Sequence, residues 1–132
     1  MRIALDTNRY RDLCDGDRDT VTVIQEAESI HLPFVVLAEL RAGFSVGKRG
    51  RENERILQRF LMKPGVGILY PQEATTRAYA SLYRQLRLQG TPIPTNDLWI
   101  AALVTEHGLA LYSRDTHFQH LPQLDLLEAP NR

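Results

Sequence analysis

Four acidic side chains could do chemistry together, because each stands near the end of a separate apolar segment: Asp6, Glu39, Asp97 and Asp115. Carboxylates that crowd together repel one another, and some of them must bind protons unless a cation joins them. A set of ligands that consists of carboxylate oxygens and includes no cysteine suits Mg²⁺ or Mn²⁺. Such a site activates water for in-line attack on a phosphodiester, so hydrolysis of phosphodiester bonds is the leading expectation.

Small polar side chains stand next to these acids and could orient them or carry water. They are Thr7, Asn8, Asn96 and Ser113. A purely structural explanation stays open for Asp97, because the helix dipole and free amide groups favour an acid in the first turn of a helix. Its helix, expected from an N-cap at Thr95 to a stop at Gly108, is otherwise apolar on every face over residues 98–104.

The segments around the acids should place them at one edge of a sheet. The helix that follows Thr95 rises about 18 Å over its dozen residues, and the expected strand over residues 109–113 returns over about 17 Å. Asp97 should therefore lie level with Asp115. The strand over residues 2–5 ends on Asp6, and the apolar run 32–36 leads into a helix with Glu39 in its first turn. Open α/β folds bind their ligands at this carboxyl edge.

The rest of the chain alternates between helical and extended segments. Helices are expected over residues 9–13, 19–29, from about 37 to 44, 51–62 and 73–89, and strands over 66–69 and 124–127. Thr7 and Asn8 are expected to cap the first helix. This order predicts one α/β domain over residues 1–132, a three-layer α/β/α sandwich with a mostly parallel central sheet.

Composition excludes several classes of protein. With no apolar run of about 18 residues and no signal-peptide pattern, the chain is expected to be soluble, cytoplasmic and independent of membranes. Its one cysteine, Cys14, excludes an internal disulfide and a cysteine-rich zinc site. Among four histidines, only His117 and His120 are closely spaced, and both are expected on the surface.

Charge is balanced overall but uneven along the chain. The formal net charge is zero, with 16 basic and 16 acidic residues. The segment from Arg41 to Lys63 is basic, and within it Arg51, Arg55 and Arg59 recur at every fourth residue. Arginine suits phosphate binding, but a solvated helix face explains the spacing equally well, and both interpretations stay open.

Four short motifs occur in order along the chain. They are Leu5-Asp6-Thr7-Asn8, Ala38-Glu39-Leu40 followed by Gly43, the run from Asn96 to Ala102, and the run from Ser113 to Phe118. Together they resemble the PIN-domain family, and within it the VapC-like toxins of type II toxin-antitoxin modules. The similarity extends from residue 1 to about residue 125.

This resemblance implies a PIN-like fold and an endoribonuclease that depends on Mg²⁺ or Mn²⁺. It also implies a homodimer, held inactive by a cognate antitoxin in a heterotetramer or larger assembly, with the antitoxin's C-terminal segment in the active-site groove. The family's acidic residues correspond to Asp6, Glu39, Asp97 and Asp115. Its first-motif Thr and Asn correspond to Thr7 and Asn8.

Two positions depart from the family pattern. Arg9-Tyr10-Arg11 stands where apolar residues usually follow the first motif, and Ser113 replaces a common Thr while keeping the hydroxyl group. The basic side chains could lie near phosphate or face solvent. For Arg114, a smaller role is expected, either in pairing with an acid or in contacting phosphate.

Two alternative functions are weighed against the nuclease. A phosphatase or phosphotransfer domain would use Asp6 as its reactive acid, but such proteins need a second acid close by in sequence, which Asp6-Thr7-Asn8 lacks. A non-catalytic metal-binding interaction module would keep the acids and act through its partner. The sequence does not distinguish which RNA is cut, whether DNA is accepted, or whether one or two ions bind.

Overall fold

Five parallel strands form the central sheet of the computed structural model, which describes residues 1–128. The strands are β1 (Arg2–Leu5), β2 (Ser29–Pro33), β3 (Val66–Leu69), β4 (Ala110–Tyr112) and β5 (Asp125–Leu127). Their order in the sheet is β3-β2-β1-β4-β5, and every recorded pairing is parallel. The α/β fold class expected from the sequence is confirmed. Residues 129–132, which the expected single domain included, lie outside the described residues.

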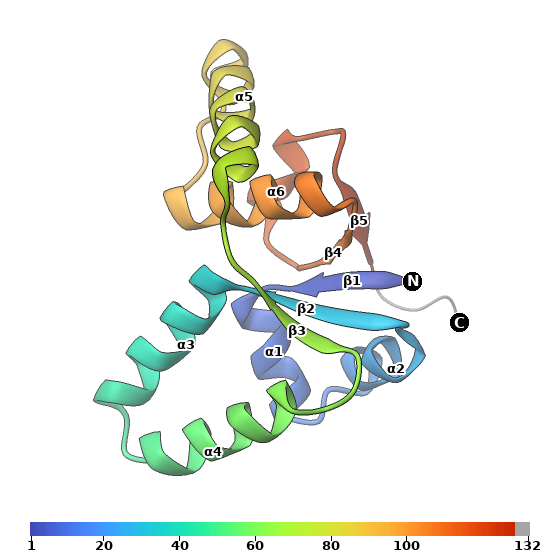
Figure 1. Cartoon of the computed structure of the whole chain (residues 1–132), viewed down its shortest axis with the longest axis vertical. Coiled ribbons are helices and arrows are strands. Elements are labelled where there is room, and N and C mark those ends of the chain that lie inside the picture. Colours follow the sequence, from blue (N-terminus) through green and yellow to red (C-terminus); the bar gives the residue numbers. More distant parts are fainter. Residues whose placement is uncertain (129–132) are drawn as a thin grey trace.

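Helices cover both faces of this sheet (Figure 1). They are α1 (Thr7–Cys14), α2 (Arg18–Glu26), α3 (Phe34–Val46), α4 (Gly50–Leu61), α5 (Glu73–Gln89), α6 (Thr95–His107) and the short 3₁₀ helix η1 (Thr116–His120). In Figure 1, α5 and α6 lie on one side of the strands, whereas α1, α2 and α4 lie on the other. The arrangement is the three-layer sandwich that alternating helices and strands predict.

The register of the strands aligns their carboxyl ends. Leu5 at the end of β1 pairs with Tyr112 at the end of β4. The residues that follow these two, Asp6 and Ser113, therefore leave the sheet side by side. On the other side of β1, Ala4 pairs with His31 of β2. The topology thus places Asp6, which follows the central strand β1, in the middle of the carboxyl edge of the sheet.

The core lies mainly around β1, β4 and helix α6. Leu5, Leu111 and Tyr112 are completely buried in the two strands. On α6, Leu98 and the five residues from Ile100 to Val104 are buried, as expected for a helix without a solvent face. The helix ends at His107 and is capped by Gly108, whose φ of 61° is the left-handed conformation that glycine adopts at least cost.

Several expected boundaries are wrong. The strand expected over residues 32–36 ends at Pro33, and α3 begins at Phe34, so Glu39 lies in the second turn of its helix rather than the first. The apolar run covers both the buried end of β2 and the buried start of α3, and hydrophobicity alone does not separate them. Similarly, α2 ends at Glu26, short of the expected residue 29.

The helix caps also differ from expectation. Asp6, not Thr7 or Asn8, is the N-cap of α1. Pro94 precedes α6, and Thr95 is its first helical residue, with no side-chain cap. Residues 116–120 form the 3₁₀ helix η1, which is not among the expected helices. In the part of the chain that the structure describes, no helix is long and apolar enough to cross a membrane.

Candidate active site

Asp6 is the buried acid at the centre of the site. Its side chain is held by two donors: Oδ1 accepts a hydrogen bond of 2.9 Å from the Arg9 backbone N–H, and Oδ2 accepts one from the Ser113 hydroxyl. The residue is only 5% exposed. Burial raises the pKa of Asp6, and the hydrogen bonds from Ser113 and Arg9 partly offset this rise.

Ser113 connects Asp6 to Asp115. Besides donating to Asp6, its Oγ accepts a hydrogen bond of 3.0 Å from the Asp115 backbone N–H. Asp115 in turn is the N-cap of η1, where its Oδ1 accepts from the His117 backbone N–H at 2.9 Å. The segment that follows β4 is therefore tied to the start of α1 through one hydroxyl group.

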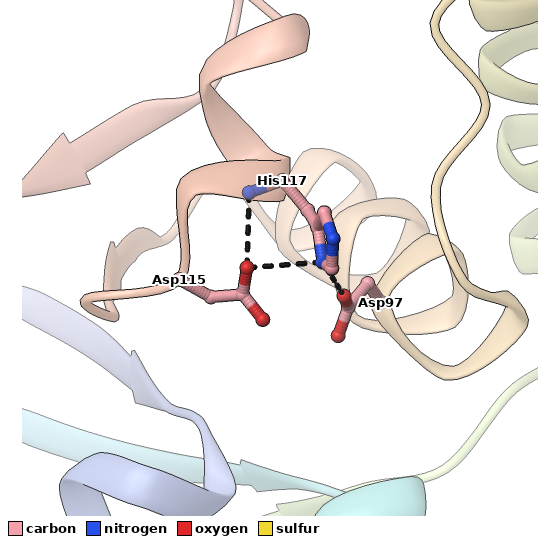
Figure 2. Close-up of side chains that lie close together, drawn as sticks. All are labelled: Asp97, Asp115 and His117. Atoms are coloured by element: carbon pink, nitrogen blue, oxygen red, sulfur yellow. Dashed lines mark hydrogen bonds and ion pairs between the residues drawn. The ribbon is translucent and has the colours of Figure 1, made fainter.

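Asp97, Asp115 and His117 form a compact cluster (Figure 2). Nδ1 of His117 lies 2.8 Å from Asp97 Oδ2 and 3.0 Å from Asp115 Oδ1. Burial raises the pKa of Asp97, the bond to His117 lowers it, and the charge of Asp115 raises it further. Asp97 and Asp115 are thus brought together, as the lengths of their helix and strand predict.

His117 is the site residue that the sequence interpretation missed. The expected surface position is correct in one sense, since its side chain is 44% exposed, but its ring faces the two acids. Their proximity raises the pKa of His117, chiefly through the bond to Asp97. The sequence offers only a weak signal for this contact: His117 stands two residues after Asp115, where the acid at the N-cap of η1 accepts its backbone N–H.

Glu39 approaches the cluster from α3. Burial raises the pKa of Glu39, and the charge of Asp97 raises it further, whereas a hydrogen bond from Asn96 and the charge of Arg11 lower it. The charge of Asp6 also contributes to the rise. Glu39 is therefore close enough to Asp97 and Asp6 for their charges to raise its pKa.

The four small polar neighbours fall into two groups. Ser113 bridges two acids, and Asn96 reaches Glu39. By contrast, Asn8 is exposed on α1. The Thr7 hydroxyl is buried and, within residues 1–128, has no hydrogen-bond partner. A buried hydroxyl of this kind needs a partner, and water around an ion would supply one.

A separate ion network adjoins the site on α1. Asp12 binds Arg114 through two hydrogen bonds of 3.1 and 3.2 Å and lies 3.4 Å from Nη1 of Arg9. The guanidinium carbon of Arg9 also lies 4.2 Å from the centre of the Tyr112 ring, a cation–π contact. Arg114 therefore pairs with an acid, one of the two roles expected for it, and the acid is Asp12.

The donor set fits a divalent cation. Asp97 and Asp115 lie with His117 in one cluster, whereas Asp6 is joined to it through Ser113 and Glu39 lies outside it, near enough to respond to the charges of Asp97 and Asp6. Burial raises the pKa of three of the four acids, Asp6, Glu39 and Asp97. Among residues 1–128, none of the four acids forms an ion pair with arginine or lysine; the ion pairs that are present involve His117. An added cation would offset burial, the larger cause of these raised pKa values, as well as the repulsion between the acids.

Comparison with known proteins points in the same direction. A family model described as the PIN domain matches residues 3–124. The chain is similar to Ribonuclease VapC4 of Mycobacterium tuberculosis, with 30% identity over 93 residues, covering 70% of this chain and 72% of the relative. VapC ribonuclease Y4jK of Sinorhizobium fredii is 29% identical over 133 aligned positions, covering 95% of each chain.

A solved structure is similar over almost the whole length. The crystal structure of VapBC2 from Rickettsia felis, bound to a DNA fragment from their promoter, contains a chain that matches with a TM-score of 0.85 and 25% identity. The match covers 98% of this chain and 100% of the other. The described layers and sheet order are thus those of a known architecture.

Proposed function

The chain belongs to the PIN-domain family, and from this premise we propose that it is a metal-dependent endoribonuclease, the toxin of a toxin-antitoxin module. Matches to proteins named VapC ribonucleases support the reaction class. The observation that carries the proposal is the convergence of Asp97 and Asp115 around His117, with Asp6 joined to Asp115 through Ser113. These side chains come from α6, from the junction of β1 and α1, and from the segment after β4.

The acids have distinct roles in this proposal. Asp6, Asp97 and Asp115 hold Mg²⁺ or Mn²⁺, and Glu39, at the side of the cluster, positions water or a second ion. A bound divalent ion supplies water activation and stabilises the charge that develops on the phosphodiester. Ser113 orients Asp6 and Asp115 by hydrogen bonding to both segments.

Charge around the site suits an RNA backbone once a cation is present. Arg11 lies near enough to Glu39 to lower the pKa of that acid, whereas Arg114 is held by Asp12. A phosphate that approaches the acids would therefore meet the Arg11 cation as well as the ion. This explains how a chain of zero formal net charge accepts a polyanion.

The partner in this proposal is a cognate antitoxin protein. The matching chain of the Rickettsia felis structure is part of a VapBC assembly, and the family resemblance implies an antitoxin segment in the active-site groove. A homodimer that binds antitoxin as a heterotetramer or larger assembly completes the proposal.

Cleavage of a mixed RNA pool by the purified chain tests the reaction. We expect RNA chains to shorten in Mg²⁺ or Mn²⁺ and to stay intact with a chelator. Asp97→Asn should abolish cleavage, whereas the matched control Asp125→Asn, at an exposed position on β5, should cleave normally. Release of phosphate without shortening would instead indicate a phosphatase, and no reaction at all would indicate a binding module.

A further inference from the structure

His117 lies between the two acids in the way a ligand of the same ion would (Figure 2). We propose that His117 binds the divalent cation directly, through Nδ1, beside the carboxylates of Asp97 and Asp115. This inference rests on the proposed function, because it adds a nitrogen ligand to the site assigned there. It changes that site from an all-oxygen set into a mixed set of nitrogen and oxygen ligands.

The spacing of the three ligand atoms carries the proposal. Nδ1 of His117 is 2.8 Å from Asp97 Oδ2 and 3.0 Å from Asp115 Oδ1, and all three ligand atoms lie within 4.8 Å of one another. Ligands that surround an ion at about 2.1 Å in an octahedron are separated from their neighbours by about 3 Å. Both contacts of Nδ1 match the separation of adjacent ligands.

The fold holds the imidazole in this place. Asp115 caps η1 by accepting the His117 backbone N–H, so the acid and the histidine are fixed to each other. The next residue, Phe118, is 1% exposed and anchors η1 in the core. Asp97 lies in the first turn of α6. The buried residues of α6 hold this helix, and so Asp97, in position.

A change of tautomer lets the ring present the required nitrogen, because Nδ1 already faces both carboxylates. Within the described residues, its recorded polar contacts are made by Nδ1, and the side chain is 44% exposed. The proton can therefore reside on Nε2, facing solvent, while Nδ1 donates its lone pair to the ion. The two carboxylates, which share Nδ1 in the structure, then share the ion instead.

A nitrogen ligand has a consequence for metal choice. Mg²⁺ prefers oxygen ligands and keeps much of its water, whereas Mn²⁺ and the later transition metals bind imidazole more readily. The site with His117 should therefore prefer Mn²⁺ to Mg²⁺ more strongly than a site made of carboxylates alone would. Replacing His117 with a carboxylate should reduce this preference.

Electron paramagnetic resonance of the Mn²⁺-loaded chain tests the proposal directly. We expect the hyperfine coupling of a directly bound imidazole nitrogen in the wild type and in His120→Gln, a control at an exposed histidine of the same short helix. The coupling should disappear in His117→Gln, with Mn²⁺ affinity reduced about tenfold or more and Mg²⁺ affinity reduced less. His117→Asp should bind Mn²⁺ without the coupling.

The outcomes separate this inference from the proposed function. If the wild type binds Mn²⁺ without nitrogen coupling, His117 is not a ligand, and the nuclease proposal is unaffected. If His117→Gln weakens Mn²⁺ and Mg²⁺ equally while the wild type lacks the coupling, His117 only positions the acids. If neither ion binds to the wild type, the inference and the metal site of the proposed function both fail.

Discussion

Helix α1 has one acid at its N-cap and another in its last turn, and only the acid in the last turn pairs with arginine. Asp12, in the last turn, contacts the guanidinium groups of Arg9 and Arg114. Asp6, at the start, accepts hydrogen bonds from a hydroxyl and a backbone N–H, but forms no ion pair with arginine or lysine among residues 1–128. Arginines thus neutralise the charge of Asp12, whereas the charge of Asp6 is stabilised mainly by hydrogen bonds.

We propose that this difference separates an acid that serves structure, Asp12, from acids that serve a reaction, Asp6 and Asp97. Burial raises the pKa of Asp6 and Asp97, which means that the folded chain disfavours their ionised forms. Arginines are present nearby, since Arg9 acts on Asp6 from a distance while contacting Asp12. We therefore propose that the site lacks paired arginines because a cation from solution takes that place, and not because cations are scarce.

The largest effect that would sharpen this comparison is on cleavage. Asp6→Asn and Asp97→Asn should each reduce the rate more than about 100-fold, beyond the loss typical of groups that only support metal ligands. Asp12→Asn should stay within about tenfold of the wild type, because Asp12 acts only by holding Arg9 and Arg114. Initial rates of RNA cleavage in Mn²⁺ measure both. Equal losses at all three positions would contradict the distinction.

Ser113→Ala should have an intermediate effect. The hydroxyl orients Asp6 and Asp115 without binding the ion in our account, so its loss should lower cleavage about tenfold and weaken Mn²⁺ affinity in parallel. Ser45→Ala is the matched control, since Ser45 is exposed on α3 and its hydroxyl donates to the Ala42 carbonyl oxygen. A Ser113→Ala variant with wild-type rate and affinity would show that the bridge is dispensable.

The two variants should rank in the opposite order for stability: Asp12→Asn, which keeps most activity, should lose more stability than Asp6→Asn, which loses activity. In metal-free protein at neutral pH, Asp12→Asn should lower the free energy of unfolding by about 1 to 2 kcal/mol, because it leaves the mostly buried Arg9 cation without its partner. Asp6→Asn should leave this free energy unchanged or raise it, since asparagine also caps helices. Denaturant unfolding with a chelator measures both, and a large loss in Asp6→Asn alone would reverse the comparison.

The pH dependence of stability should identify Asp6 more specifically. Because its pKa is raised above the ordinary value of 3.8 in the folded chain, the native state binds protons more tightly than the unfolded state. The contribution of Asp6 is present at low pH and is lost as pH rises through the raised pKa. Metal-free wild type should therefore lose stability relative to Asp6→Asn as pH increases. A constant difference between the two would exclude a raised pKa at this position.

The smallest effect is expected at Arg114. Its side chain is 55% exposed, so Arg114→Ala should lower the free energy of unfolding less than Asp12→Asn does. If pairing with Asp12 is its role, the dependence of cleavage on salt concentration should not change. A weaker salt dependence in the variant would instead show that Arg114 contacts phosphate.

Much of the site could be predicted from the sequence because its acids end regular elements. The rise of α6 and the return of β4 place Asp97 level with Asp115, and the structure brings the two together. The boundary between β2 and α3 could not be predicted, since Leu32 and Val35 are both buried although one is extended and the other helical. Apolar residues at such a junction carry no period that distinguishes the two conformations.

His117 shows why the rest of the site was out of reach. Its two partners lie 20 and 2 residues away in sequence, and neither spacing is a known pattern for metal-binding histidines. The contact depends on η1, a short helix without apolar periodicity. The cap of α1 was missed for a related reason: Asp6 was assigned a chemical role, whereas its side chain also accepts the Arg9 N–H.

Calorimetric titration of the metal-free chain with Mn²⁺ shows whether the acids form a site for a divalent cation. We expect uptake of Mn²⁺ by the wild type and by Asp12→Asn, and loss of uptake in Asp97→Asn. No uptake by the wild type, or uptake that Asp97→Asn leaves unchanged, would contradict this expectation.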